Sequence, residues 1–369
     1  QPDGAVSPCC ASYGTIDRIK DNNIEKVWNG KNYQLLREAM FDWEMLPEYC
    51  KKCEAFMRYD YIDDYWNLIE DKENVLIPPN YYPPTGTIKN EELLELIEKK
   101  HQEEKGKNSV IRDNNLDVFL TEMVEQNTII SNSPIELLIG LTNVCNLHCA
   151  FCLYCGFCMK KIQSKEMLSW DAIEKLRKYL STAEIVIPSG RGEPLIYENF
   201  EKFMNLCRET GAIQKMQLVN NGTLLNRYDP EIFDGTNILS ISFDSVHKEI
   251  FELLRCGSNY ELIINNIKTL REKLPNAIIQ FSVTVNRLNM EEIADIYRLA
   301  RRLGINYISY NSLYGYEEDK VIQLLHLRKD DKKIIEKQLK LVKELNSDNK
   351  IEIVDVITWE QEDDGEVYN

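Results

Sequence analysis

The chain of 369 residues carries 60 acidic and 44 basic side chains, which give it a formal net charge of -16. Its composition, 43% hydrophobic and 28% charged, supports a buried core and excludes a collagenous, low-complexity or wholly disordered chain. The negative charge repels phosphate backbones, so we expect no nucleic-acid partner. Nowhere do about 18 consecutive apolar residues occur, and the first thirty residues lack a signal-peptide pattern. We expect a soluble, cytoplasmic protein with no membrane partner.

Residues 1–56 form a small segment that cysteines bracket at both ends. Cys9 and Cys10 are adjacent, and Cys50 and Cys53 form a CxxC pair. Eleven cysteines in the whole chain are too few for a disulfide scaffold, and in a reducing cytosol such clusters favour metal ligands over disulfides. Apolar periodicity predicts two helices between the cysteines, at residues 24–28 and 33–41.

Residues 57–133 differ from that segment in composition. A proline-containing stretch at 80–84 breaks regular structure, and a charged helix is expected at 91–105. Apolar periodicity predicts a second helix at 116–124. We interpret this part of the chain as a helical connector.

Beyond residue 134, short apolar runs alternate with amphipathic helices, which is typical of repeated β-α units with a parallel sheet. Six such repeats fall short of the eight of a full barrel of about 200 to 250 residues. We therefore predict an α/β fold, a partial and open (β/α)6 TIM-like barrel over 134–357, followed by a solvated acidic tail at 358–369. The expected strands are 135–141, 184–188, 215–219, 238–243, 277–285, 307–311 and 351–357. The expected helices begin near Ser169, Phe200, Ile293 and Asp331, and the second and third end at Gly211 and Gly304.

Five cysteines fall within fourteen residues, directly after the first expected barrel strand. Active sites of such barrels are built from the loops at the carboxyl ends of the strands. Cys145, Cys149 and Cys152 on one short loop can bind three irons of a cubane cluster and leave the fourth iron without a protein ligand. An open iron of this kind can bind a small molecule.

The spacing Cx3Cx2C, with Phe151 just before the third cysteine, resembles the cluster motif of the radical S-adenosylmethionine (radical SAM) superfamily. Further segments follow in the order expected for that family. The segment SGRGEP resembles the family's GGEP segment, and Asn220-Asn221-Gly222-Thr223 is similar to its TNG turn. The strand SISFDS resembles the strand that gives ribose contacts.

The resemblance covers about residues 134–357 and implies roles for several residues. Glu193 is expected to contact the methionine amino group of S-adenosylmethionine, Ser242 its ribose, and Arg255 its methionine carboxylate. The full set of candidate cofactor-binding residues is Phe151, Gly190, Gly192, Glu193, Asn221, Ser242 and Arg255.

Two features depart from the family pattern. Arg191 replaces a glycine, and this long cation either reaches the substrate or lies on the surface. Cys155 and Cys158 extend the cysteine run into a register that looks like the cluster-binding run of a bacterial ferredoxin. Their alternative interpretation is that of loop cysteines near the cluster.

Residues 1–56 resemble the SPASM or Twitch unit that follows many radical SAM barrels and holds an auxiliary 4Fe-4S cluster. Cys9, Cys50 and Cys53 are the candidate ligands, with zinc or no metal as alternatives. Here the unit precedes the barrel. Either it ends a preceding module of a tandem protein, which would leave it truncated, or the chain is a permuted enzyme in which Cys10 or a barrel cysteine is the fourth ligand.

The resemblance implies a radical SAM enzyme of an anaerobic cytoplasm. A reductase such as a flavodoxin or ferredoxin would supply the electron that cleaves S-adenosylmethionine. The resulting 5'-deoxyadenosyl radical would abstract hydrogen from a peptide or small-molecule substrate. The alternative, an iron-sulfur electron-transfer or scaffold protein without radical chemistry, would not require Glu193, Asn221, Ser242 and Arg255 in their order. We expect a structural role for Cys207, a structural or incidental one for Cys256, and a solvent-facing position for His148.

Overall fold

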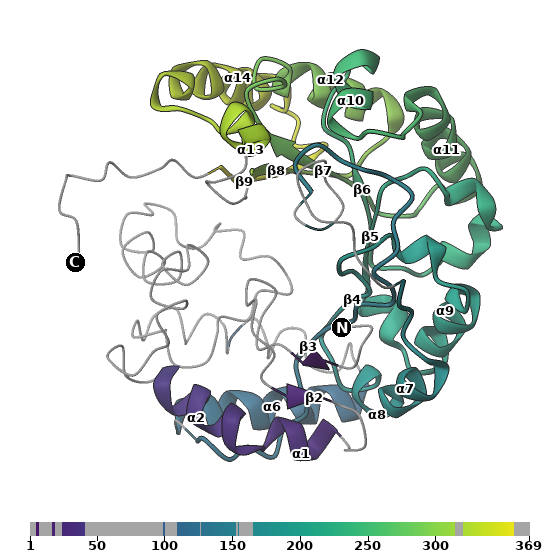
Figure 1. The fold of residues 1–369 in the computed structure, drawn as a ribbon, viewed down its shortest axis with the longest axis vertical. Coiled ribbons are helices and arrows are strands. Elements are labelled where there is room, and N and C mark those ends of the chain that lie inside the picture. The colour runs from purple at the N-terminus through teal and green to yellow at the C-terminus, as the bar shows by residue number, and fades with distance from the viewer. Residues whose placement is uncertain are drawn as a thin grey trace. The chain divides into compact units, whose positions relative to one another are not determined.

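A computed structural model describes residues 5–6, 17–18, 24–40, 99, 109–125, 127–152, 154, 165–313 and 320–357 (Figure 1). The chain divides into two compact units. The first comprises 1–139, 168–186 and 206–215, and the second comprises 140–167, 187–205 and 216–369. Within the described part of the chain, no helix has the length and apolar character needed to cross a membrane.

The first unit is mainly helical, and buried arginines connect its helices. Arg112 is only 3% exposed and donates hydrogen bonds to the carbonyl oxygens of Ala183 (2.8 Å) and Leu180 (3.1 Å). It thereby satisfies carbonyl groups at the end of a helix, which lack partners within the helix itself. The unit contains β1 (Ala5–Val6) antiparallel to β2 (Asp17–Arg18), α1 (Ile24–Trp28), α2 (Lys31–Met40), α6 (Val110–Val124), β3 (Glu136–Leu138), α7 (Trp170–Lys175) and α8 (Arg177–Leu180).

The helices expected in this unit are present with shifted ends. The predicted helix at 33–41 begins two residues earlier, and the one at 116–124 extends back to Val110. Ser169 is the predicted N-cap, since its side chain accepts a hydrogen bond from the N–H of Ala172. The helix that it begins is interrupted at Leu176. The N–H of Leu176 donates a hydrogen bond to the carbonyl oxygen of Ile173, three residues earlier, at 2.9 Å. The helix expected at 91–105 lies outside the described residues except for Lys99, which is helical.

The second unit contains a five-stranded parallel sheet in the order β5-β6-β7-β8-β9, with helices along one face (Figure 1). Strands adjacent in sequence are adjacent in the sheet and are joined by helical connections, as in a (β/α) barrel. Two further strands, β3 and β4 (Ile185–Ile187), pair with each other. With these two strands and the five-stranded sheet, every predicted barrel strand is present, and the fold is the expected partial TIM-like barrel. The strands are β5 (Gln217–Asn220), β6 (Ile238–Ser242), β7 (Ile279–Val285), β8 (Tyr307–Ser312) and β9 (Glu352–Val356).

The helices of the barrel end where the sequence predicts. Gly211 (φ 71°) follows α9 (Phe200–Glu209), and Gly304 (φ 70°) caps α12 (Ile293–Leu303) in the left-handed conformation that glycine adopts without strain. Four more helices follow along the chain: α10 (Lys248–Leu254), α11 (Tyr260–Lys273), α13 (Lys320–Leu325) and α14 (Lys332–Leu345).

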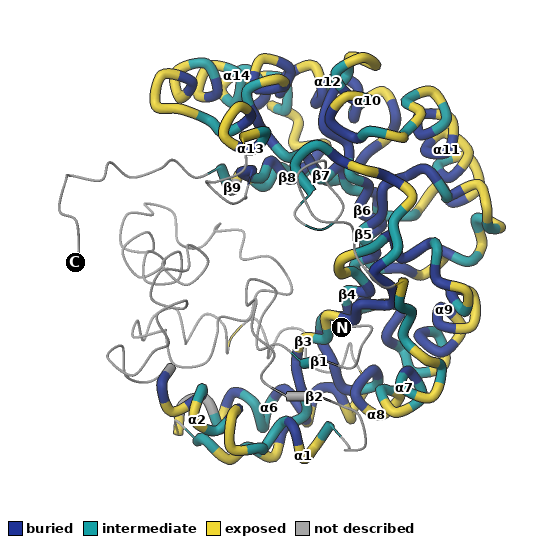
Figure 2. Tube along the Cα trace, viewed as in Figure 1, coloured by how far each residue is buried: buried dark blue, intermediate teal, exposed yellow. Residues whose placement is uncertain are grey.

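The core of the second unit lies between the sheet and its helices (Figure 2). On β7, side chains at alternate positions are buried, and Phe281 stacks on Phe243 with ring centroids 4.5 Å apart. Alternation with a period of two residues is what a strand with one packed face requires. Tyr310 of β8 is fully buried on the same side and donates a hydrogen bond to the carbonyl of Ile293 in α12.

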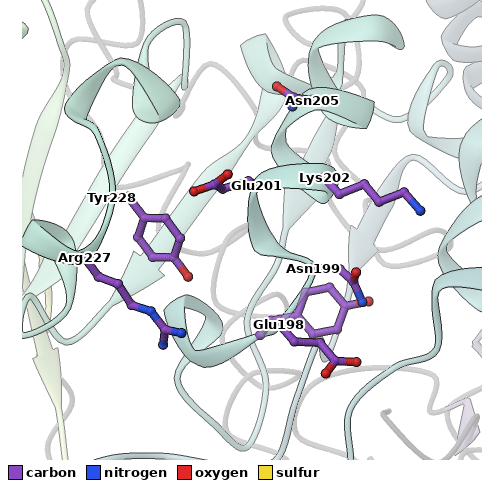
Figure 3. Close-up of a pocket in the computed structure, with 8 residues that line it drawn as sticks. Glu198, Asn199, Glu201, Lys202, Asn205, Arg227 and Tyr228 are labelled. Carbon is purple, nitrogen blue, oxygen red and sulfur yellow. The ribbon is translucent and has the colours of Figure 1, made fainter.

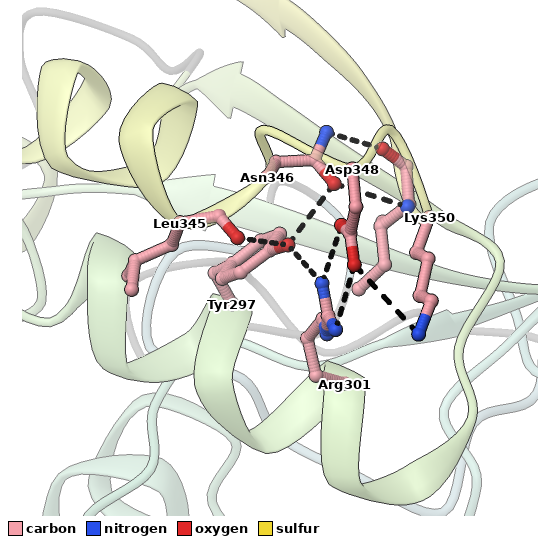
Figure 4. A network of polar contacts seen from close by, with 7 residues as sticks. Tyr297, Arg301, Leu345, Asn346, Asp348 and Lys350 are labelled. Atoms are coloured by element: carbon pink, nitrogen blue, oxygen red, sulfur yellow. Dashed lines mark hydrogen bonds and ion pairs between the residues drawn. The ribbon is translucent and has the colours of Figure 1, made fainter.

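A polar network fixes the connection from α14 to β9 (Figure 4). Arg301 of α12 contacts both carboxylate oxygens of Asp348, at 2.7 and 3.1 Å. The hydroxyl of Tyr297 bonds to Asn346, which in turn donates to the carbonyl of Ile351 at 2.7 Å. These contacts hold the start of the last strand against α12.

Candidate iron-sulfur and S-adenosylmethionine site

Cys145, Cys149 and Cys152 lie on one loop of the second unit, and each sulfur accepts its own N–H hydrogen bond. The donors are the backbone N–H of Leu147 to Cys145 (3.5 Å), the backbone N–H of Tyr154 to Cys152 (3.4 Å), and Nη1 of Arg255 to Cys149 (3.9 Å). N–H groups that point at cysteine sulfurs stabilise negative charge there and are a determinant of iron-sulfur cluster potentials. The three thiols therefore have the surroundings that cluster-bound thiolates need.

The electrostatics of the metal-free thiols are consistent with a shared site. The pKa of Cys149 is raised to about 11, mainly by burial; Arg255 opposes this rise, whereas Cys152, Asp244 and Cys145 contribute to it. Burial likewise raises the pKa of Cys145. Burial therefore favours the protonated thiols of Cys145 and Cys149, whereas bound iron would favour their thiolates.

No group of three or more His, Cys, Asp or Glu side chains within the described ranges converges on a single metal ion. A cubane cluster does not require such convergence, because each cysteine binds a different iron. Three cysteines on one loop are a donor set that fits a 4Fe-4S cluster with an open iron.

The cysteine loop is anchored at both of its sides. The N–H groups of His148 and Ala150 donate to the carbonyls of Cys256 and Leu254, just after α10 and at its end. Phe151 and Ala150 pack against a small apolar cluster, made of Leu254, Leu313, Ile322 and Leu325. The loop is thereby held by α10 and α13.

Asn146, between the first two cysteines, links the loop to the turn after β5. Its amide nitrogen donates to Thr223 Oγ1 at 2.8 Å, and its carbonyl oxygen accepts from Asn221 Nδ2 at 2.9 Å. The sequence singled out Asn221 but not Asn146, whose partners lie more than seventy residues away.

The glycines of SGRGEP permit close backbone approach to the segment around the cysteine loop. A Cβ on Gly192 would clash with backbone atoms of Val144 and Asn143, and one on Gly190 would lie 3.0 Å from Gly140 Cα. The N–H of Glu193 then donates to the carbonyl of Val144 at 2.8 Å. The two segments pack so closely because neither glycine has a side chain.

Glu193 is a buried carboxylate, only 3% exposed. Its Oε2 accepts the backbone N–H of Asn221 at 2.9 Å, and its Oε1 accepts that of Leu195 at 3.2 Å. Burial raises the pKa of Glu193 to about 7, although these two hydrogen bonds and Arg255 lower it. A carboxylate in this position would be stabilised by a cation such as a ligand ammonium.

Arg255 is held by Asp244, which is fully buried just beyond the end of β6. The Nε of Arg255 lies 2.6 Å from Asp244 Oδ2, and its guanidinium carbon lies 5.6 Å from the centre of the Phe151 ring. Burial lowers the pKa of Arg255, but Asp244 and then Cys149 raise it more. Sequence reasoning expected this guanidinium at a ligand carboxylate and missed its protein partner.

The remaining predicted residues occupy varied positions. Ser242 is half-buried at the end of β6. Arg191 is exposed, with its guanidinium carbon 5.2 Å from the centre of the Tyr154 ring, so it lies on the surface beside the residue that donates to Cys152. Cys207 is fully buried and His148 is exposed, as expected, and Cys256 is half-buried. The candidate cysteines that lie outside the described residues are Cys9, Cys10, Cys50, Cys53, Cys155 and Cys158.

A separate hollow of about 550 Å³ lies around the start of α9 (Figure 3). It is lined by the basic side chains of Lys202 and Arg227 and by the acidic side chains of Glu198 and Glu201. None of the predicted site residues lines it, so it is not part of the cysteine site.

The fold and the cysteine loop define an iron-sulfur protein built on a partial barrel. Residues 139–300 match the family model of the radical SAM superfamily, and residues 1–54 match that of the SPASM iron-sulfur cluster-binding domain. The chain belongs to the radical SAM superfamily and carries a SPASM-like segment at its N-terminal side. The cofactors of this class are a 4Fe-4S cluster and S-adenosylmethionine, with an iron-sulfur cluster in the SPASM segment.

Several known proteins are similar to this chain. A GTP 3',8-cyclase of Aquifex aeolicus is 26% identical over 215 residues, which are 54% of this chain and 65% of the cyclase. An AdoMet-dependent heme synthase of Methanosarcina barkeri is 27% identical over 203 residues, 52% of this chain and 55% of the synthase. The chain spans 29% of Molybdenum cofactor biosynthesis protein 1 of Dictyostelium discoideum, with 28% identity.

The crystal structure of Streptococcus suis SuiB bound to S-adenosylmethionine has the same fold. It superimposes with a TM-score of 0.50 at 14% identity, covering 88% of this chain and 66% of SuiB. The chain therefore spans less than two thirds of the length of the curated relatives described, and about two thirds of SuiB.

Proposed function

We propose that the chain reductively cleaves S-adenosylmethionine and uses the resulting 5'-deoxyadenosyl radical to abstract hydrogen from a peptide or small-molecule substrate. The observation that carries this proposal is the loop of three cysteines, each with its own N–H donor, joined to Glu193 and Asn221 by hydrogen-bonded segments. An electron carrier would need the thiols but not the buried carboxylate beside them.

Cys145, Cys149 and Cys152 would hold the barrel cluster, which supplies the electron for cleavage when it is bound. Glu193 would accept the ammonium of the methionine part, since both of its oxygens are buried and already point at N–H donors. The Nη groups of Arg255 would bind the methionine carboxylate, because its Nε is engaged by Asp244. Ser242 and Asn221 would orient the ribose end.

The protein must also keep water from the reacting atoms. Phe151 packs with α10 and α13 at the cysteine loop, and it covers one side of Arg255 with its ring. A reduced cluster and a carbon radical both react with oxygen, so we place the reaction in an anaerobic cytoplasm with a flavodoxin or ferredoxin as the reductase.

In the N-terminal segment we propose an auxiliary cluster at Cys9, Cys50 and Cys53. The match of residues 1–54 to an iron-sulfur cluster-binding domain supports it. The proposed domain limits are 1–56 for this segment, 57–133 for the helical connector and 134–357 for the barrel.

The test is a triple variant, Cys145→Ala, Cys149→Ala and Cys152→Ala, reconstituted anaerobically with iron and sulfide beside the unchanged chain. We expect the variant to lose 5'-deoxyadenosine formation, because three irons of the barrel cluster lose their ligands. Undiminished 5'-deoxyadenosine formation by the variant would overturn the proposed site.

A further inference from the structure

The short helix α13 separates the cysteine loop from an exposed surface. On its buried side, Ile322 and Leu325 belong to an apolar cluster that Phe151 contacts. Phe151 directly precedes the ligand Cys152 in the sequence. Leu324 of the same helix is 67% exposed. A helix with its side chains is about 10 to 12 Å across, so a molecule that contacts Leu324 would lie about one helix away from the cysteine loop.

The loop after β7 adds a second segment to this surface. The N–H of Arg287 donates to the carbonyl of Leu325 at 2.9 Å, and its Nε lies 3.1 Å from Asp331 Oδ2. These contacts hold the loop beside the end of α13 and the turn that follows it. Leu288, the next residue, is 43% exposed. Single exposed leucines are common on protein surfaces, so the apolar part alone does not indicate a partner.

The turn after α13 and the helix α14 are basic, although the chain as a whole is acidic. Residues 328–343 contain seven Lys or Arg and three Asp or Glu, whereas the whole chain has 44 against 60. Of the three acidic residues, Asp331 is buried in an ion pair. Arg328 and Lys333 are exposed, and exposed positions recur along α14 (Figure 2). Lys320 is not counted, because three acidic residues directly precede it in the sequence.

A basic surface with exposed leucines suits a transient complex with an acidic protein. Electron-transfer complexes are small, with less than about 1,200 Å² of buried surface. Complementary charges raise the association rate of such encounters about tenfold to a thousandfold. Because the net charge of -16 repels an acidic partner overall, a locally positive surface decides where that partner can approach.

We propose that Arg328, Lys333 and Leu324 form the docking surface of an acidic electron-carrier protein that reduces the barrel cluster. This inference rests on the proposed function and adds to it the place where the electron enters. One electron leaves the reduced carrier, which is oxidised, and passes to the cluster, which is reduced, and no atom is transferred. An acidic peptide substrate would also be attracted to these charges. A substrate must reach the bound S-adenosylmethionine itself, whereas an electron need only cross the width of α13, so the position of the surface favours the carrier.

The experiment uses the full reconstituted chain with a purified, reduced flavodoxin, and with dithionite as a small reductant that needs no docking surface. The double variant Arg328→Glu, Lys333→Glu reverses two charges of the surface. It should fold, because the contact to Asp331 uses the backbone N–H of residue 328, and an acidic residue is favoured in the first turn of α14. The matched control, Lys268→Glu, Lys273→Glu, reverses two exposed charges on α11 and changes the net charge equally.

Stopped-flow absorbance measures how fast flavodoxin reduces the cluster, and 5'-deoxyadenosine is measured with each reductant. At low ionic strength, cluster reduction should be at least about tenfold slower in the double variant and less than about twofold slower in the control. At about 1 M salt, where the Debye length is about 3 Å, the two should differ less than about twofold. Leu324→Ala changes no charge and should slow reduction about fivefold at both salt concentrations. With dithionite, all variants should form 5'-deoxyadenosine as the unchanged chain does.

Three results would overturn the inference. These are no reduction by flavodoxin of an unchanged chain that dithionite reduces, equal rates in the double variant and the control, or a loss in the double variant that persists at high salt. Circular dichroism shows whether the double variant is folded, and the single variants Arg328→Glu and Lys333→Glu give the same comparison if it is not. Absence of 5'-deoxyadenosine with both reductants, while flavodoxin still reduces the cluster, would instead contradict the proposed function, so the two failures are distinguishable.

Discussion

The guanidinium of Arg255 is bound to the carboxylate of Asp244, with Nε 2.6 Å from Oδ2. Asp244 is itself fixed, because its Oδ1 accepts the backbone N–H of Thr284 at 2.8 Å. The pair leaves Nη1 of Arg255 facing Cys149 at 3.9 Å. Asp244 therefore orients the cation that we assign to the ligand carboxylate, and it connects β6 and β7 to the cysteine loop.

The first prediction concerns Arg255→Ala. Loss of a charge-assisted hydrogen bond of about 1.5 to 3 kcal/mol should weaken S-adenosylmethionine binding by tenfold or more, with iron content unchanged. Equilibrium titration of the reconstituted protein measures the affinity. Equal affinities in the variant and the unchanged chain would rule out this role.

The same substitution leaves Asp244 buried without its partner. Removing one partner of a buried ion pair lowers the free energy of unfolding by about 3 to 5 kcal/mol, whereas removing both charges lowers it much less. The double variant Asp244→Asn, Arg255→Gln should therefore be more stable to urea than Arg255→Ala, although it too binds S-adenosylmethionine weakly. A double variant less stable than the single one would contradict this account of the pair.

The second prediction is a pH dependence that arises from Glu193. Burial raises its pKa from 4.5 to about 7, so between these values the folded chain binds more protons than the unfolded one. Its contribution to stability is present at low pH and is lost as the pH rises through about 7, by roughly 3 kcal/mol.

Glu193→Gln removes the titrating group and should remove this decline. Urea unfolding of the cluster-free chain and of the variant across that range checks it, and parallel pH profiles would contradict it. A ligand ammonium beside Glu193 lowers its pKa, so S-adenosylmethionine binding near neutral pH should also release a proton, measurable by calorimetry in two buffers.

The third prediction concerns the link between Asn146 and the turn at Asn221. Asn146→Ala removes two hydrogen bonds, each worth about 0.5 to 1.5 kcal/mol, and should loosen the cysteine loop. Chelator should then extract barrel iron about fivefold to tenfold faster. The control is Asn226→Ala, which changes an exposed asparagine a few residues after the turn at Asn221. Equal rates of iron extraction from the two variants would show that the link does not hold the loop.

The fourth prediction separates the two registers of the cysteine run. Cys155→Ala together with Cys158→Ala should leave cleavage of S-adenosylmethionine largely intact, because three thiolates suffice for a cluster with an open iron. The assay is again 5'-deoxyadenosine formation under anaerobic conditions. Abolished cleavage would favour the ferredoxin register.

The barrel strands and most helices follow from the sequence, because hydrophobic periodicity is a local signal. β7 alternates with a period of two, and Gly304 ends α12 where a left-handed residue is needed. The interruption at Leu176 carries no such signal, since a leucine there fits the periodicity of one continuous helix.

The contacts that assemble the site could not be predicted in the same way. In the sequence, nothing distinguishes Asn146 from other loop asparagines, because its partner Thr223 is 77 residues away and only the fold puts the two side chains in contact. Asp244 and Arg255 are separated by the whole of α10, and only the position of that helix puts them in contact. Residue patterns identify the donors, whereas tertiary packing decides which of them meet.

The most direct test of the account is the reaction itself. The reconstituted chain, with dithionite and S-adenosylmethionine under anaerobic conditions, should form 5'-deoxyadenosine and methionine in equal amounts. Formation should depend on both the cluster and the reductant, because the cluster delivers the cleaving electron. A chain that binds iron, sulfide and S-adenosylmethionine but forms no 5'-deoxyadenosine would contradict radical chemistry and favour an electron-transfer or scaffold protein.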